Sequence, residues 1–131
     1  MRRTIATALV AILSTIVVGL ATAKAGGDTR LSARLAGAAT NGMVPKGVAE
    51  FRSRADGSSQ IKVQVENVNL QGAVLNVLID NNKIGEITIG ATLAGQFQAN
   101  TRDGEAVPPV GSGSTAVVTD QAGATIVAGT F

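Results

Sequence analysis

The chain has 131 residues and contains no cysteine, histidine, tryptophan or tyrosine, and only three phenylalanines. Without histidine or cysteine, it lacks the usual ligands of zinc, copper, haem and iron–sulfur sites, the nucleophile–base pairs of serine and cysteine hydrolases, and any disulfide. Without tryptophan or tyrosine, it lacks the aromatic platforms that stack on sugars or nucleobases. We therefore expect a protein that is not an enzyme and that carries no cofactor.

Residues 1–25 have the pattern of a secretory signal peptide. Two arginines precede an apolar core at 5–20 and a small-residue tail, so we expect Sec-type cleavage after Ala23 or Ala25. An uncleaved membrane anchor is the alternative interpretation, but the short core and the alanine-rich tail favour cleavage, which leaves no membrane span. The domain at 26–131 is therefore expected to be exported to the periplasm or the extracellular space of a bacterium, where disulfides are permitted but not needed.

Removal of the signal peptide changes the charge of the protein. The full chain has eleven basic and nine acidic residues and a net charge of +2; three of the basic residues precede residue 26, which leaves eight. The net charge of the mature domain is then about −1, so its overall charge does not indicate a nucleic-acid partner. We expect the partner to be another envelope or secreted protein, and the oligomeric state stays open.

The mature chain alternates apolar and polar residues in short runs separated by turn residues, which is the pattern of β-strands. We expect strands at residues 31–35, 47–54, 60–65, 74–79, 84–89, 96–100, 114–119 and 124–131. The second and third of these strands are separated by a short turn, which predicts an antiparallel hairpin.

The strongest pattern lies between residues 60 and 89. The run at 74–79 is almost continuously apolar, so we expect a strand that is central in its sheet or buried on both sides. It ends at 80–83, where asparagines adopt positive φ at low cost and close a tight hairpin. The segment 66–73 is less regular and predicts a crossover between sheets, with Val68 and Leu70 closing one end of the core.

Eight short strands with turn signals between them predict an all-β fold. We expect a single antiparallel β-sandwich of about seven or eight strands, with a Greek-key or immunoglobulin-like topology, after an N-terminal signal helix. A barrel is the alternative, and the strand order is left open. Phe51 is expected to point inward, and Phe131, which closes the last strand, is expected to be buried.

Four short motifs resemble the chordin-type (CHRD) domain. They are Leu-Ala-Gly at 35–37, Pro-Lys-Gly-Val-Ala-Glu-Phe at 45–51, Leu-Ala-Gly at 93–95 and Gly-Thr-Phe at 129–131. The resemblance implies an extracellular β-sandwich, found in bacteria in short exported proteins, with a fold similar to copper/zinc superoxide dismutase. The histidine-containing central motif of that family is absent, so the resemblance implies no metal, no superoxide chemistry and no functional residue. Another family of short exported β-sandwich proteins is the alternative.

Several polar clusters are candidate sites, and each has a simpler structural interpretation. Asp103-Gly104-Glu105 and 80–82 offer oxygen ligands for calcium but lack the alternating carboxylates of a calcium loop, so both are interpreted as turns. Asp80 and Glu86 flank one hairpin and could be an acid/base pair only in a pocket, so solvated strand ends are the favoured interpretation. The glycines at 111–114 lack the lysine and helix of a phosphate loop.

Arginines gather on the outward faces of the first two predicted strands, at Arg30, Arg34, Arg52 and Arg54. They predict a small basic patch if these strands are neighbours. Protection of an exposed strand edge against aggregation is the alternative, and it is the favoured one.

We expect an exported, non-enzymatic β-sandwich that serves as a structural or protein-interaction module. The alternative is a module that binds a small ligand or an oligosaccharide with its end loops, and a hydrolase that relies on carboxylates alone is the least favoured. Binding surfaces are commonly built from loops, so the looser segments 36–46 and 101–113 are the expected location. The candidate binding-loop residues are Asn41, Lys46, Arg102, Asp103 and Glu105.

Overall fold

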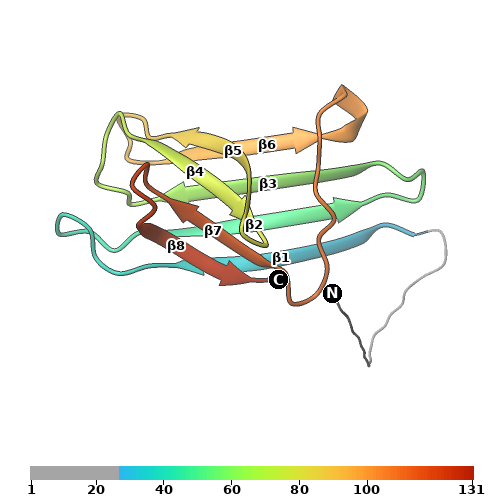
Figure 1. Ribbon diagram of the computed structural model, residues 1–131, viewed down its shortest axis with the longest axis horizontal. Helices are drawn as coiled ribbons and strands as arrows, with labels where there is room; N and C mark the ends of the chain where they lie inside the picture. The colour runs from blue at the N-terminus through green and yellow to red at the C-terminus, as the bar shows by residue number, and fades with distance from the viewer. Residues whose placement is uncertain (1–26) are drawn as a thin grey trace.

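The computed structural model describes residues 27–131, which form eight antiparallel strands in one nearly closed sheet with almost no helix (Figure 1). The strands are β1 (Thr29–Ala36), β2 (Lys46–Ser53), β3 (Ser59–Glu66), β4 (Val74–Ile79), β5 (Asn82–Thr88), β6 (Gly95–Asn100), β7 (Thr115–Thr119) and β8 (Thr125–Thr130), with one 3-10 turn, η2 (Thr101–Asp103). Their order across the sheet is β5-β4-β7-β8-β1-β2-β3-β6. The expected signal peptide at 1–25 lies outside the described residues. Within 27–131, no helix is long and apolar enough to cross a membrane.

The sheet folds over so that its two halves face each other. Figure 1 shows one half, formed by β1, β2, β3 and β6, behind the other half, formed by β4, β5, β7 and β8. The predicted alternation accounts for the core: along β3, Ile61, Val63 and Val65 are buried between the halves, whereas Gln64 and Glu66 face outward. The polar residues that alternate with the buried ones therefore form the outer surface of the half that contains β1, β2, β3 and β6.

The predicted strands and their main connections are confirmed. β2 and β3 form the expected antiparallel hairpin. β4 is central, between β5 and β7, but its burial alternates, and Val74 at its start remains 37% exposed. The β4–β5 hairpin turns through Asp80 and Asn81, which have φ values of 49° and 69°, as expected for a two-residue hairpin turn.

Two connections cover the open ends of the core. Val68, in the β3–β4 crossover, is fully buried, and Leu70 packs against the core, as predicted. At the other end, the segment after η2 crosses in front of β3 and β2, and its Val107 and Val110 pack on the core (Figure 1). The prediction that Phe131 is buried is wrong: this residue follows the end of β8 and is only half-buried, although it packs against the core.

The two halves of the sheet meet along two seams, one between β1 and β8 and one between β5 and β6, and a glycine permits the close approach at each. β1 and β8 share a single residue pair, Ala36 with Ala128, and next to it a Cβ on Gly129 would lie 2.2 Å from the carbonyl oxygen of Arg34. On the other side, a Cβ on Gly85 of β5 would lie 2.2 Å from the ring of Phe97 of β6. Glycine inside a strand often marks such a close approach, and these two positions require it.

Candidate functional site

The outer face of β1, β2, β3 and β6 is the most distinctive surface of the domain. Strand pairing places its side chains in rows across the sheet, because partners in an antiparallel register point to the same face. One row is Arg30, Arg52, Gln60 and Asn100; the next is Ser32, Glu50, Lys62 and Gln98; the third is Arg34, Val48, Gln64 and Gln96. We call the surface formed by these rows, together with Lys46 and Glu66 at its end, the polar face. Every member is exposed or half-exposed.

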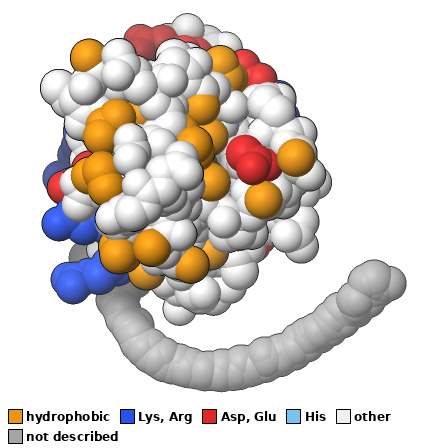
Figure 2. Space-filling view, turned by 90° about the vertical axis from the view of Figure 1, so that its left-hand side faces the viewer, with side chains coloured by type: hydrophobic (Ala, Val, Ile, Leu, Met, Phe, Trp, Pro, Cys, Tyr) orange, Lys and Arg blue, Asp and Glu red, His pale blue; other side chains and the backbone are white. Residues whose placement is uncertain are grey.

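Positive charge is concentrated on the polar face. It carries five of the eight basic residues of 27–131 but only two of the nine acidic ones. In Figure 2, seen along the strands, Lys and Arg gather on one side of the molecule. The opposite outer surface is nearly neutral, because β4, β7 and β8 contain no charged residue. The domain is therefore strongly polarised despite its small net charge.

Part of this charge has no counter-ion within the described chain. Lys46 lies 3.7 Å from Glu66, and Arg52 forms an ion pair with Asp28. Within residues 27–131, Arg30, Arg34 and Lys62 take part in no ion pair. These three side chains are free to contact an anionic partner.

The surface is hollowed around two of the free cations. A depression of about 340 Å³ lies on this surface. Its polar lining residues are Arg30, Ser32, Glu50, Arg52, Gln60 and Lys62, and Leu31 and Phe51 also line it. Arg30 is the register partner of Arg52, and Lys62 is the register partner of Glu50. The directly opposed Arg30 and Arg52 repel each other, so an anion bound between these two side chains would relieve their repulsion.

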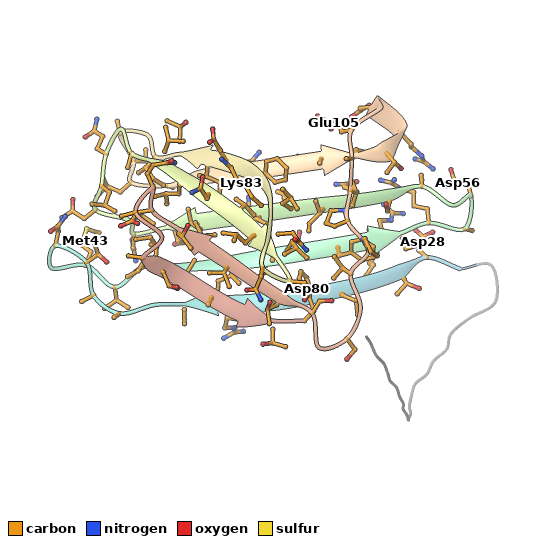
Figure 3. All side chains as sticks on the ribbon, viewed as in Figure 1. Asp28, Met43, Asp56, Asp80, Lys83 and Glu105 are labelled. Atoms are coloured by element: carbon orange, nitrogen blue, oxygen red, sulfur yellow. The ribbon has the colours of Figure 1, made fainter. Side chains whose placement is uncertain are left out.

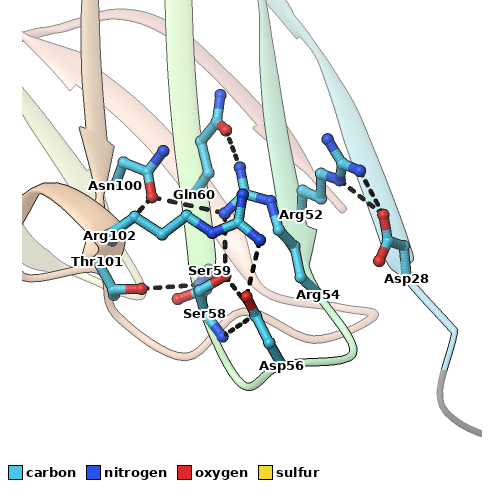
Figure 4. Close-up of polar contacts among 10 residues, drawn as sticks. All are labelled: Asp28, Arg52, Arg54, Asp56, Ser58, Ser59, Gln60, Asn100, Thr101 and Arg102. Carbon is cyan, nitrogen blue, oxygen red and sulfur yellow. Dashed lines mark hydrogen bonds and ion pairs between the residues drawn. The ribbon is translucent and has the colours of Figure 1, made fainter.

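A hydrogen-bonded cluster fixes the turn at one end of the polar face (Figure 4). The Asp56 carboxylate accepts hydrogen bonds from the Ser58 hydroxyl at 2.6 Å and the Ser58 backbone N–H at 2.9 Å, and it pairs with Arg102 at 2.7 Å. The Thr101 hydroxyl accepts from the Ser59 N–H at 2.9 Å. The β2–β3 turn and η2 are thereby held together.

Arg54 belongs to this cluster and not to the strand face predicted for it. It follows the end of β2, and its guanidinium donates to Ser58 Oγ at 3.2 Å and to Gln60 Oε1 at 2.5 Å. Asn100 Oδ1, which accepts the Arg102 N–H at 3.0 Å, lies 3.5 Å from the same guanidinium. These contacts hold Arg54 in the cluster, so it is less available for binding than the free cations.

Two carboxyl groups near this end are acidified. Hydrogen bonds from the Ser58 side chain, then the Arg102 guanidinium, hold the pKa of Asp56 well below its ordinary value. The hydrogen bond from Arg52, opposed in part by desolvation, lowers the pKa of Asp28. Both groups are therefore ionised at any physiological pH.

The depressed pKa of Asp56 gives a pH-dependent prediction. Its stabilising contribution is present above the ordinary carboxyl pKa of about 3.9 and is lost as the pH falls through the lower folded-state pKa. We expect Asp56→Asn to lower the urea midpoint slightly at neutral pH, and the difference from the wild type to shrink below about pH 4. Far-ultraviolet circular dichroism during urea titration measures this. A difference that stays constant down to acid pH would refute the assignment.

The predicted binding-loop residues lie at opposite ends of the domain. Figure 3 shows Met43, in the β1–β2 loop, at one end and Asp56 and Glu105 at the other. Asn41 and Asn69 exchange hydrogen bonds with each other's backbone carbonyls at 3.1 and 2.8 Å, and Glu105 accepts the Asn100 N–H at 2.9 Å. The structure therefore does not bring the two loops into one site.

The remaining predicted residues divide in the same way. Lys46 begins β2 near the Asn41 end and belongs to the end of the polar face. Arg102 pairs with Asp56 at the other end, and the exposed Asp103 ends η2 beside it. Arg102 and Glu105 are thus brought together with the β2–β3 turn, whereas Asn41 and Lys46 are remote from them.

The other clusters considered have structural roles. Asp80 Oδ1 accepts the Thr115 N–H at 3.0 Å, which ties the β4–β5 turn to β7, and Glu86 pairs with Lys83 at 2.8 Å. The Gly111 N–H donates to Ser114 Oγ at 3.0 Å within its own loop. Among residues 27–131, no three His, Cys, Asp or Glu side chains are grouped so that they could hold a metal ion.

Sequence reasoning identified part of the polar face and missed the rest. It placed Arg30, Arg34 and Arg52 outward on the first two strands, but it did not consider Lys62, on the third strand, as part of the same surface. The alternation in 60–65 already placed Lys62 and Gln64 on the outer side of that strand. The hairpin of β2 and β3 was predicted, but the pairing of β1 with β2 and the register of the three strands were not, and these place Lys62 beside the arginines.

No family model, no curated protein and no solved structure matches this chain, so the polar face has to be interpreted from its own chemistry.

Proposed function

We propose that residues 26–131 are a non-enzymatic module, exported from a bacterial cell, that acts by binding a macromolecular partner in the envelope or the extracellular space. The observation that carries this proposal is the polar face, a broad, cation-rich surface with three basic side chains that form no ion pair within residues 27–131, at one side of a domain whose other charged residues are mainly acidic. A surface of this kind favours recognition of an extended partner over the enclosure of a small substrate.

We also propose that the domain is a Greek-key β-sandwich, not a barrel. β4 and β5 form a hairpin, β6 crosses to the other half beside β3, and β7 returns to lie beside β4, which is the connection of a Greek key divided between two facing sheets. The single residue pair between β1 and β8, and the absence of a ladder between β5 and β6 in the described sheet, favour two facing sheets. Such a sandwich is compatible with the resemblance to the CHRD domain and with the proposed export, which both remain proposals.

The end-loop alternative has less support. A small ligand or oligosaccharide site built from loops needs polar groups that converge and are free to bind. Asn41 and Glu105 lie at opposite ends, and each is engaged in hydrogen bonds within the chain. The polar face has both convergence and free groups, at Arg30 and Lys62.

Site-directed shielding tests the proposed function. The chain contains no cysteine, so a single introduced thiol can be labelled selectively with a maleimide polyethylene glycol. We expect the exported domain to associate with an envelope or extracellular fraction of the producing cells, and a polymer at Gln64→Cys to abolish this association by covering the polar face. Cosedimentation of the labelled domain with the fraction measures the association.

The matched control is Thr88→Cys carrying the same polymer. Gln64 and Thr88 are both exposed strand residues, but Thr88 lies on β5 in the other half of the sheet. We expect this variant to associate normally. Equal association of the two labelled variants, or no association of the unlabelled domain with any fraction, would overturn the proposed function.

A further inference from the structure

We propose that the partner of the polar face is an acidic polysaccharide whose carboxylates are bound by Arg30, Arg34 and Lys62. This inference rests on the proposed binding function and names the chemical class of its partner. The neighbourhood of Arg30, Arg52 and Lys62 anchors one carboxylate, and Arg34 contacts the chain further along the same strand. An extended ligand is needed, because Arg30 and Arg34 are four residues apart, about 13 Å along a strand.

The charge pattern of the depression specifies an anion. Three basic side chains surround a single carboxylate, Glu50, so the depression has a net positive charge. Asp28 forms its ion pair with Arg52, whose hydrogen bond is the main cause of its lowered pKa. Arg30, the register partner of Arg52, lies close enough to lower the pKa of Asp28 further but forms no ion pair in the described chain. A ligand carboxylate between Arg30 and Lys62 would supply that counter-ion through charge-assisted hydrogen bonds.

The neutral residues of the polar face suit a hydroxyl-rich chain. Next to the cations lie side-chain amides and a hydroxyl, which both donate and accept hydrogen bonds. They are Gln64, Gln96, Gln98 and Ser32. Gln64 and Gln96 already bond to each other across β3 and β6 at 3.2 Å, which holds them in position and leaves further donors and acceptors free.

The composition of the polar face disfavours the other macromolecular partners. It has no aromatic residue on which nucleobases or sugar rings could stack, so a polysaccharide would be held by its carboxylates and hydroxyls alone, and its only apolar member is Val48, 37% exposed. Protein interfaces derive most of their affinity from buried aromatic and apolar anchors, which this surface does not provide. Membrane surfaces are usually engaged by basic residues with apolar side chains beside them to enter the lipid, and these are missing here too.

Affinity measurements with defined polymers test this inference. We expect the folded domain to bind polygalacturonate, a polymer of uronic acids, and not dextran, which is uncharged. Because the contacts are electrostatic and exposed, binding should weaken as added salt shortens the Debye length from about 30 Å at 0.01 M to about 8 Å at 0.15 M. Isothermal titration calorimetry with each polymer, at each of the two salt concentrations, measures these affinities.

Two double variants locate the site. Arg30→Gln with Lys62→Gln removes two free cations from the polar face, and we expect roughly a tenfold or greater loss of affinity for polygalacturonate. Lys83→Gln with Arg102→Gln removes the same charge from elsewhere, and we expect less than about a twofold change. Circular dichroism confirms that both variants remain folded.

The outcomes separate this inference from the proposed function. No binding of polygalacturonate at low salt, or equal losses in the two double variants, would overturn the inference. Binding to vesicles of anionic phospholipid without binding to polygalacturonate would overturn it in favour of a membrane surface. If the shielding experiment still succeeds in either case, the binding function stands and only the class of partner is wrong.

Discussion

Replacing Val77 by aspartate is expected to unfold the domain. Val77 is fully buried in β4, where it is paired with Gly85 of β5 and Val118 of β7. An unpaired carboxylate at this position costs about 3–5 kcal/mol or more, a large share of the roughly 5–15 kcal/mol that stabilises a typical domain. The chain contains no tryptophan or tyrosine, so far-ultraviolet circular dichroism is the appropriate measurement.

The control for this substitution lies in the same strand. Val74 is 37% exposed at the start of β4, on the side away from the core. We expect Val74→Asp to cost about 1 kcal/mol or less, because its charge remains in water. A Val77→Asp variant as stable as Val74→Asp would contradict the assignment of the core.

Replacing Gly129 by valine is expected to open the seam between the two halves. A Cβ at this position would lie 2.2 Å from the Arg34 carbonyl oxygen and 2.9 Å from Leu35 Cδ2. The closer atom belongs to the backbone, so no change of rotamer relieves the clash. We expect a loss at the upper end of the roughly 1–3 kcal/mol that overpacking usually costs, measured as a lower urea midpoint.

Gly111 provides the matched control for the seam. It lies in the β6–β7 connection, and a Cβ added there would meet no atom within 4 Å. Gly111→Val should therefore leave the urea midpoint nearly unchanged. Equal effects of the two substitutions would show that the backbones at the seam do not approach as closely as described.

The local structure could be predicted from the sequence because strand alternation and turn chemistry are local properties. Val63 and Lys62 face opposite sides of β3 because successive side chains on a strand do so, whatever the strand pairs with. The turn at Asp80 and Asn81 could be predicted because few residue types adopt positive φ at low cost.

The arrangement in space could not be predicted because it depends on pairings between distant segments. β8 lies beside β1 although more than eighty residues separate them, and no local pattern encodes that contact. The same holds for the candidate site: Arg30 and Lys62 were both recognisable as outward residues, but only the register of β1, β2 and β3 brings them to one depression. A binding site in the loops was expected because binding surfaces are commonly built from loops, but the two predicted loops lie at opposite ends of the domain.

The polarity of the domain also depends on this arrangement. Residues 26–131 are close to neutral by composition, so the overall charge did not indicate a nucleic-acid partner. Once the strands pair, five basic residues share one surface while β4, β7 and β8 carry no charge. The small net charge therefore conceals a local concentration of positive charge on the polar face.

Chemical-shift mapping of the isotopically labelled domain during titration with polygalacturonate tests the role of the polar face most directly. We predict that the perturbed backbone amides cluster at Ser32, Glu50, Lys62 and Gln64, with those of β4 and β7 unchanged. Perturbations confined to the end loops, around Asn41 or Glu105, would contradict binding at the polar face and would restore the end-loop alternative.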